Sequence, residues 1–287
     1  MTTLSAEGTE GAAPGYRASA TLPLRVEFVR QLRRRRTLLT LGFLVVLPFL
    51  LWIAFSVGSS DSGGGATLID LARSSAANFV VFTLFSAVSF LLVVVVALFF
   101  GDTVASEASW STLRYLLAVP VPRGRMLRQK AAVAALLSLI ALVLLPTVAL
   151  GVGLVAYGAG DLVSPTGQSQ ALTPTLLRLA VVPLYLALHL AWVAGLALLL
   201  SVSTDAPLGA VGGAVMVSIL SQILESIDAL GSLRDVLPTR WSSAWSDLLA
   251  APIDWTHLAS GVLSGLAYAT VFGLAAWWRF STKDITS

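Results

Sequence analysis

The sequence contains six long windows without a single Asp, Glu, Lys or Arg. They are Thr37–Gly58, Asn78–Gly101, Ala131–Gly160, Leu179–Thr204, Ala206–Leu224 and Leu258–Trp278. A helix in water needs charged side chains on its exposed face, whereas a charge at the centre of a bilayer costs about 2.5–3.5 kcal/mol on insertion scales. Each window has about 20 residues or more, enough for a helix to cross about 30 Å of hydrocarbon. The sequence therefore predicts an all-α integral membrane protein with six transmembrane helices.

The residues outside these windows do not suggest a second domain. They are divided among tails and loops, and no stretch of them is long and apolar enough to form a separate soluble core. Residues 1–21 are rich in Gly, Ala, Ser and Thr and are expected to be a disordered tail. Residues 22–287 are expected to form one six-span domain. The chain has no Cys, which excludes disulfides and thiolate chemistry within it.

Basic residues fall mostly on one side of the predicted membrane. If six spans alternate in direction, all but four of the eighteen basic residues share a side, the exceptions being Arg73, Arg178, Arg234 and Arg240. Because basic residues favour the cytoplasmic side, both termini are predicted to be cytoplasmic, in a multi-pass protein of the plasma membrane. The run Arg33–Arg36 is interpreted as an anchor against anionic lipid headgroups rather than as a nucleic-acid site.

Three segments between or before the spans have a pattern of their own. Leu22–Arg36 alternates apolar and basic residues and predicts an amphipathic helix on the inner membrane surface. The inner loop between the second and third spans has helix-forming residues over Ala105–Ala118, which Pro120 and Pro122 terminate. Ser226–His257 mixes Asp and Trp and predicts amphipathic helices half-buried in the outer interface.

Polar side chains recur at helical spacing on two of the predicted spans. On the second span they are Asn78, Ser86 and Ser89, and Phe82 lies on the same face. On the fifth span they are Ser218, Gln222 and Glu225. Polar side chains facing lipid would cost energy, so both faces should point into the protein or into a wet cavity. Two interpretations stay open, namely hydrogen bonding between helices and a substrate path.

Common catalytic motifs are missing. A P-loop requires a Gly directly before its Lys. The two lysines of the chain, Lys130 and Lys283, are preceded by Gln129 and Thr282 instead. Cofactor and metal sites are not expected in this chain. His189 in the fourth span has two interpretations, a packing residue bonded to a backbone carbonyl or a proton carrier.

The inner loop resembles that of the membrane subunits of ATP-binding-cassette exporters of the type-2 fold, the ABC type-2 permeases. Those subunits carry a pattern like E-x-x-x-G-T-L-x-x-L-L-x-x-P-V-S-R-x-x-x-L-x-x-K. This chain has Glu107, then Ser111-Thr112-Leu113, Leu116-Leu117, Pro120-Val121-Pro122-Arg123, Leu127 and Lys130. Ser111 replaces the usual Gly and Pro122 the usual Ser. The resemblance extends over most of the chain, because the amphipathic leading helix, the six spans and the outer segment also match.

The resemblance implies partners and roles. In that family the loop helix is the coupling element that sits in a groove of a separate P-loop ATPase subunit, and two six-span bodies with two ATPase domains form one exporter. The implied coupling residues are Glu107, Trp110, Arg114, Tyr115 and Arg123, with Glu27 and Arg30 on the leading helix. The chain itself would then be no enzyme, and ATP and Mg²⁺ would bind the partner ATPase. The second permease subunit could be identical or different, membrane lipid is a further partner, and nucleic acid is not.

The predicted function is export of an amphipathic or lipophilic substrate, such as a drug, a lipid or a natural product. The proposed path is lined by Phe, Ser, Asn and Gln, and Glu225 is its one candidate charge. Two alternatives come from other classes. A proton-coupled secondary transporter would use His189 as carrier, and a scaffold or sensor subunit would bind an ATPase without moving a substrate.

Overall fold

The computed structural model describes residues 24–58, 68–109, 123–164, 167–250 and 252–282. The elements are α1 (Leu24–Leu32), α2 (Arg35–Val57), α3 (Leu68–Arg73), α4 (Ala76–Val88), α5 (Leu91–Ser109), α7 (Arg123–Tyr157), β1 (Leu162–Val163), β2 (Ser169–Gln170), α8 (Leu172–His189), α9 (Ala191–Ser203), α10 (Pro207–Glu225), η1 (Asp228–Val236), η2 (Ala244–Leu249) and α11 (Trp255–Thr282). Among these residues, five helical segments are long and apolar enough to cross a membrane, and the bent pair α4 and α5 brings them to six. The predicted helical membrane body is confirmed.

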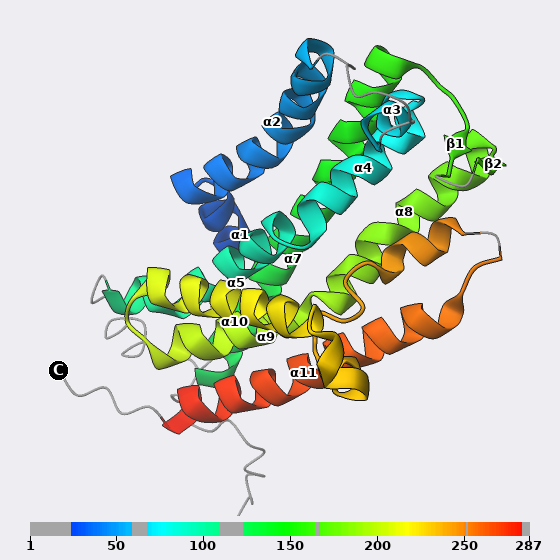
Figure 1. The fold of residues 1–287 in the computed structure, drawn as a ribbon. Coiled ribbons are helices and arrows are strands. Elements are labelled where there is room, and N and C mark those ends of the chain that lie inside the picture. The colour runs from blue at the N-terminus through cyan, green and yellow to red at the C-terminus, as the bar shows by residue number, and fades with distance from the viewer. Residues whose placement is uncertain (1–23, 59–67, 110–122, 165–166, 251, 283–287) are drawn as a thin grey trace, which may run out of the picture.

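The helices run back and forth between two ends of the body (Figure 1). At one end, Lys130 near the start of α7 contacts α1 and the last turns of α5. The last turn of α11 lies there too, because Arg123 donates to the Ser281 carbonyl at 3.3 Å. We call this the charged end. The opposite end, called the far end, carries α3, the antiparallel β1–β2 hairpin and η2.

The second span is broken, whereas the sequence predicted one continuous helix over Asn78–Gly101. α4 and α5 are separated by Ser89 and Phe90 and are bent by 55°. The hydroxyls of Thr83 and Ser86 donate to backbone carbonyls four residues earlier in α4. Such back-bonding often bends helices, and bends at membrane depth occur where neighbouring side chains can satisfy the freed backbone groups.

The leading amphipathic helix is shorter than predicted, and it buries two polar side chains. α1 ends at Leu32 and α2 begins at Arg35, so the predicted helix over Leu22–Arg36 does not continue through the arginine run. The buried residues of α1 are Glu27 and Gln31, and the sequence had not indicated that polar side chains of this helix pack against the protein. The reason is Lys130 of α7, whose Nζ lies 3.8 Å from Glu27 Oε1, together with Arg30 of α1 itself, because these cations offset the cost of burying the Glu27 carboxylate.

The segment between the fifth and sixth spans is built of short 3₁₀ helices rather than longer amphipathic ones. None of the residues of η1 is buried, whereas η2 buries apolar side chains within the protein. Trp245 of η2 is fully buried and its ring lies 4.6 Å from that of Phe85 on α4. Through this contact, η2 connects the segment between the fifth and sixth spans to α4 of the second span.

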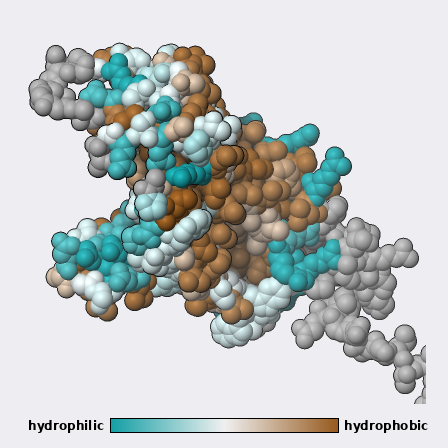
Figure 2. Space-filling view, turned by 90° about the vertical axis from the view of Figure 1, so that its right-hand side faces the viewer, coloured by the Kyte–Doolittle hydropathy of each residue, from teal (hydrophilic) through white to brown (hydrophobic). Residues whose placement is uncertain are grey.

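Much of the apolar surface is exposed on the outer helices. Figure 2 shows one face of the molecule, on which hydrophobic side chains gather in the middle between hydrophilic regions. Exposed large apolar side chains cover α2, α10 and α11, for example Leu39, Ile53, Met216, Leu220, Leu263 and Leu274. Water would strongly disfavour such a surface, so lipid or another membrane subunit covers it.

Glycines let α11 approach α8 and α9 closely. A Cβ atom at Gly265 would lie 2.6 Å from the carbonyl oxygens of Leu188 and His189. A Cβ atom at Gly195 of α9 would lie 3.1 Å from the backbone of Ala269. Small residues are typical of tight contacts between membrane helices. In this protein they set the spacing between the fourth and sixth spans.

We expect the substitution Gly265→Ala to destabilise the protein, because the added methyl must displace two backbone carbonyls. Overpacking of this kind costs about 1–3 kcal/mol. Gly273→Ala on the same helix is the matched control, since a Cβ atom there meets nothing within 4 Å. The thermal midpoint of the purified protein in detergent should fall only for Gly265→Ala. Equal midpoints for the two variants would contradict this packing.

Candidate functional site: a buried charge network at one end of the bundle

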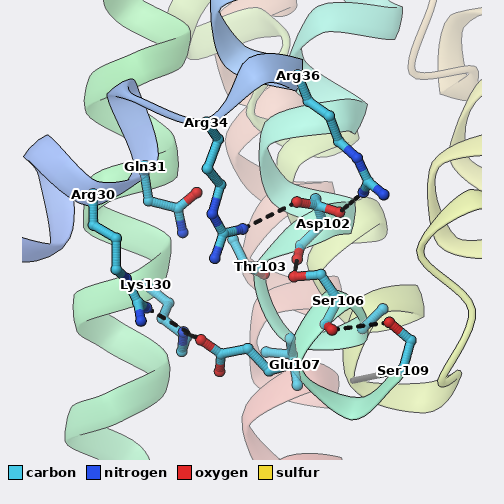
Figure 3. A network of polar contacts seen from close by, with 12 residues as sticks. Arg30, Gln31, Arg34, Arg36, Asp102, Thr103, Ser106, Glu107, Ser109 and Lys130 are labelled. Atoms are coloured by element: carbon cyan, nitrogen blue, oxygen red, sulfur yellow. Dashed lines mark hydrogen bonds and ion pairs between the residues drawn. The ribbon is translucent and has the colours of Figure 1, made fainter. Parts of the chain in front are cut away.

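Charged side chains from three helices meet at the charged end. Lys130 of α7 donates directly to Glu107 Oε1 of α5, and its Nζ lies 3.8 Å from Glu27 Oε1 of α1. Arg30 Nη2 lies 2.7 Å from Glu27 Oε2 and 3.3 Å from Glu107 Oε1. Figure 3 shows Arg30, Glu107 and Lys130 reaching toward one another from separate ribbons. We call Glu27, Arg30, Glu107 and Lys130 the charged joint.

The charged joint is largely buried and electrically balanced. Glu27 is 8% exposed, and Glu107 and Lys130 are each 5% exposed. Removing such charges from water costs several kcal/mol per ion, and only close partners of opposite charge offset that cost. Here two carboxylates face two cations. If one partner were removed, its counterpart would stay behind as an uncompensated charge.

Glu27 is held in its ionised form by this surrounding. Burial alone would raise the pKa of Glu27, but the hydrogen bond from Arg30 and the charges of Lys130 and Arg30 outweigh burial and hold the pKa below its ordinary value of 4.5. The folded state therefore favours the carboxylate. The stabilisation is present at neutral pH and is lost only as the pH falls through the lowered pKa.

A second ionic contact fastens the α1–α2 junction to α5. Asp102 accepts hydrogen bonds from Arg36 Nη1 at 2.7 Å and from Arg34 Nη1 at 3.2 Å. Figure 3 shows both arginines extending from the junction toward this carboxylate. The leading segment is thus attached to α5 at two levels, through Asp102 and through Glu107.

α5 is also tied to α9 by an unusual hydrogen bond. The fully buried Ser201 Oγ accepts from the backbone N–H groups of Val104 at 3.0 Å and Ala105 at 3.1 Å. These N–H groups lie within α5, and a hydroxyl from a neighbouring helix takes both. The last turns of α5 are therefore held by α1, α7 and α9 together.

The structure brings together some of the predicted coupling residues and not others. Glu27, Arg30 and Glu107 form part of one network. Arg123 begins α7, where its side chain is exposed and donates to the Ser281 carbonyl. The remaining predicted coupling residues, Trp110, Arg114 and Tyr115, lie outside the described residues.

The predicted loop helix over Ala105–Ala118 is revised at its start, because Ala105–Ser109 belong to the second span, and the rest of that range lies outside the described residues. Ala105–Ser109 continue α5 without a break, and Glu107 is buried rather than presented on a cytoplasmic surface. The physical reason is that Lys130 and Arg30 neutralise this carboxylate inside the protein, so the helix of the second span can extend past it. After the loop, Gly124–Lys130 form the first turns of the continuous helix α7.

The predicted path residues are divided between two places. Asn78 and Phe82 line a cavity at the far end. Asn78 bonds the backbone of Val163 with both amide atoms, at 2.7 and 2.9 Å. The exposed Ser86 donates to the carbonyl of Phe82 in its own helix. The interpretation as structural hydrogen bonds is therefore favoured for Asn78.

The other predicted path residues gather at the break in the second span. Gln222 Nε2 of α10 donates to the Ser89 carbonyl at 2.8 Å and lies 3.3 Å from Ser218 Oγ. A backbone carbonyl freed at membrane depth costs several kcal/mol if nothing bonds it, so Gln222 stabilises the break. Glu225 lies at the end of α10, 3.8 Å from Arg240 Nη1.

His189 packs between helices. It is 1% exposed, its Nδ1 lies 3.3 Å from the Gly261 carbonyl oxygen of α11, and its ring stacks on Tyr185 with centroids 5.8 Å apart. This geometry supports the packing interpretation of His189 rather than a proton carrier that exchanges with water. Within the described ranges, no group of three or more His, Cys, Asp or Glu side chains is placed to hold a metal ion.

Several residues of the network were not predicted from the sequence. The sequence analysis assigned no role to Asp102, which directly follows a charge-free window, or to Ser201. It used Lys130 only as part of the loop pattern. A signal for Asp102 exists, because an isolated carboxylate at the inner end of a span is expected to pair with a nearby arginine run. No sequence signal distinguishes Ser201 from the other hydroxyl residues.

The chain was compared with known protein families. The family profile described as "ABC-2 family transporter protein" matches residues 24–209, more than half of the 287 residues. The match begins at α1, contains the whole charged joint, and ends within α10. No curated protein matches the chain.

The charged joint can be tested with a double-mutant cycle. We expect Glu107→Ala and Lys130→Ala each to lower the free energy of unfolding by about 3 kcal/mol, because each leaves a buried charge short of its partner. The double variant should lose less than the sum of the two, by about 0.5–3 kcal/mol. Unfolding in detergent, followed by circular dichroism, measures all four proteins.

The control for this cycle is a pair on the surface. Asp228 is 93% exposed in its contact with Arg234 at 2.7 Å, so Asp228→Ala should leave the unfolding midpoint near that of the wild type. Strictly additive losses from Glu107→Ala and Lys130→Ala would show that the two side chains do not stabilise each other.

Proposed function

Because the chain belongs to the ABC-2 transporter family, we propose that it is the membrane-spanning subunit of an ATP-driven exporter whose ATPase is a separate chain. The observation that carries the proposal is the charged joint. It lies where α5 ends and α7 begins, on both sides of residues 110–122, and it includes the leading helix α1. A force applied to that linking segment would reach three helices at once.

The proposed mechanism is a lever. ATP would draw two partner ATPase domains together, and each would carry the segment around Trp110, Arg114 and Tyr115 with it. In this scheme Glu107 does not touch the ATPase. It transmits the movement, because its carboxylate connects α5 to Lys130 of α7 and to Arg30 of α1. ATP can shift the permease only by binding one of its two states more tightly, through the partner.

The break in the second span gives this lever a place to act. α5 is held rigidly at the charged end, whereas its other end meets α4 at the 55° bend. There, a side-chain hydrogen bond from Gln222 joins the Ser89 carbonyl to α10. We place the substrate path between the second and fifth spans at this bend, with Ser218 and Glu225 on α10.

The surface near this path suits an amphipathic or lipophilic substrate. Phe90 at the bend and Met216 and Leu220 on α10 are exposed. The half-buried amide of Gln222 lies on another face of α10, above the buried hydroxyl of Ser218. Such a surface can accept apolar groups together with a few hydrogen bonds. A drug, a lipid or a natural product has this chemistry.

The proposal includes further partners and a place in the cell. A second permease subunit, identical or different, would cover part of the exposed apolar surface of α2 and α10, and lipid would cover the rest. ATP and Mg²⁺ would bind the ATPase partner. The plasma membrane, with α1 and the end of α11 on the cytoplasmic side, agrees with the basic residues gathered at the charged end.

We expect Arg114→Ala to weaken capture of the partner ATPase and to slow transport, while the amount of protein in the membrane and its thermal midpoint stay unchanged. The physical reason is the loss of a charge that the ATPase groove would contact, while the charged joint keeps all four of its residues. Tagged protein purified from membranes with its ATPase, and uptake into inside-out vesicles, provide the measurements.

Arg73→Ala is the matched control, because Arg73 is an exposed charge at the end of α3, at the far end. It should retain both ATPase capture and transport. Wild-type capture and transport in Arg114→Ala would contradict the docking role. Transport that continues with no ATPase present would contradict the exporter and favour a secondary transporter, whereas ATPase capture without any transport would favour a scaffold.

A further inference from the structure

A cavity of about 620 Å³ lies at the far end, between α3, α4, the β1–β2 hairpin and η2. Its wall is mainly apolar and includes Leu71, Val81, Phe82, Phe85 and Leu249. The volume falls within the range of about 300–1,000 Å³ that is typical of small-ligand sites. No residue of the charged joint contributes to it, so it is a separate site.

The polar side chains in this wall already have partners within the protein. The Asn78 amide donates to the Val163 carbonyl and accepts from the Val163 N–H. Gln170 donates to the Leu249 carbonyl and accepts from Arg178. The other polar side chains of the wall, Ser164, Ser246 and Asp247, are bonded internally as well. A ligand in this cavity therefore gains little from hydrogen bonds, and its affinity must come from apolar contact.

The cavity continues into the surface that lipid would cover. Two of its lining side chains, Leu68 and Phe85, are 68% and 49% exposed. Phe85 belongs to α4, which is part of a candidate membrane span, and an apolar opening on such a span meets hydrocarbon chains rather than water.

We propose that this cavity binds a single acyl chain, which enters from the leaflet at the far end and leaves its polar head outside. A long apolar chain without hydrogen-bonding groups fits a wall whose polar atoms are engaged, and the bilayer supplies such chains at high concentration. The occupant would lie against α4, on the far side of the bend from α5. Its presence would support α4 against η2 and would make the far end responsive to the lipid composition.

The test uses photoreactive lipids. The full-length protein in nanodiscs is labelled in one arm with a phosphatidylcholine that carries a diazirine on one acyl chain, and in a second arm with diazirine-bearing palmitic acid. Mass spectrometry then locates the labelled residues. We expect Leu71, Phe82 or Leu249 to be labelled several-fold more than the exposed lipid-facing residues Leu39 and Leu263. Labelling in the first arm identifies a bilayer lipid as the source, and labelling only in the second identifies a free fatty acid.

Filling the cavity should remove this labelling. Val81→Phe narrows the cavity, and Ala250→Trp obstructs its rim from an exposed position, so at least one variant should fold normally. Each should reduce labelling of the cavity several-fold. Val155→Phe is the matched control, since Val155 is 91% exposed on α7. Cavity labelling no stronger than that of Leu39 in both arms, or labelling unchanged in a folded filling variant, would overturn the proposal.

Discussion

The contact on which the rest of the structure depends is the ion pair between Lys130 and Glu107. Neither charge could remain buried alone, because each would lose several kcal/mol of hydration without compensation. Glu27 and Arg30 then join the pair from α1, so a helix outside the spans becomes part of the bundle. Asp102 and Ser201 add contacts to α2 and α9. The result is one rigid end of a membrane body whose other helices contact each other mainly through small and apolar side chains.

The second span shows how rigidity and freedom are distributed. Its inner half, α5, is bound by charges and by two backbone hydrogen bonds to Ser201. Its outer half, α4, packs against α3 and α7, and a cavity lies at its side. Between them the chain bends by 55°, and Gln222 bonds the exposed carbonyl of Ser89. A movement of α5 that starts at the charged end would therefore change the angle at the bend first and displace the far end last.

The sequence predicted the membrane body well, because the absence of charge over about 20 residues is a strong constraint on any helix in lipid. It also indicated that Glu27, Arg30 and Glu107 matter, although only through a family resemblance. It placed Glu107 on the surface, because burial of a carboxylate depends on cations from α1 and α7 that no local pattern reveals. The bend at Ser89 was missed for the same reason, since its stabilising donor, Gln222, is supplied by a helix more than a hundred residues away in the chain. Local periodicity reports which faces are polar, and tertiary contacts decide what those faces do.

The central claim is that α1, α5 and α7 move as one body because buried charges bind them together. It is tested most directly by the distance between spin labels on α1 and α7, at Val26→Cys and Ala132→Cys. Both positions are exposed and the natural chain has no other cysteine. In the complex with the ATPase, the account predicts one narrow distance distribution that is the same with and without ATP, and a broad one when Lys130→Ala is added. A distance that changes with ATP, or a distribution that stays narrow in Lys130→Ala, would contradict it.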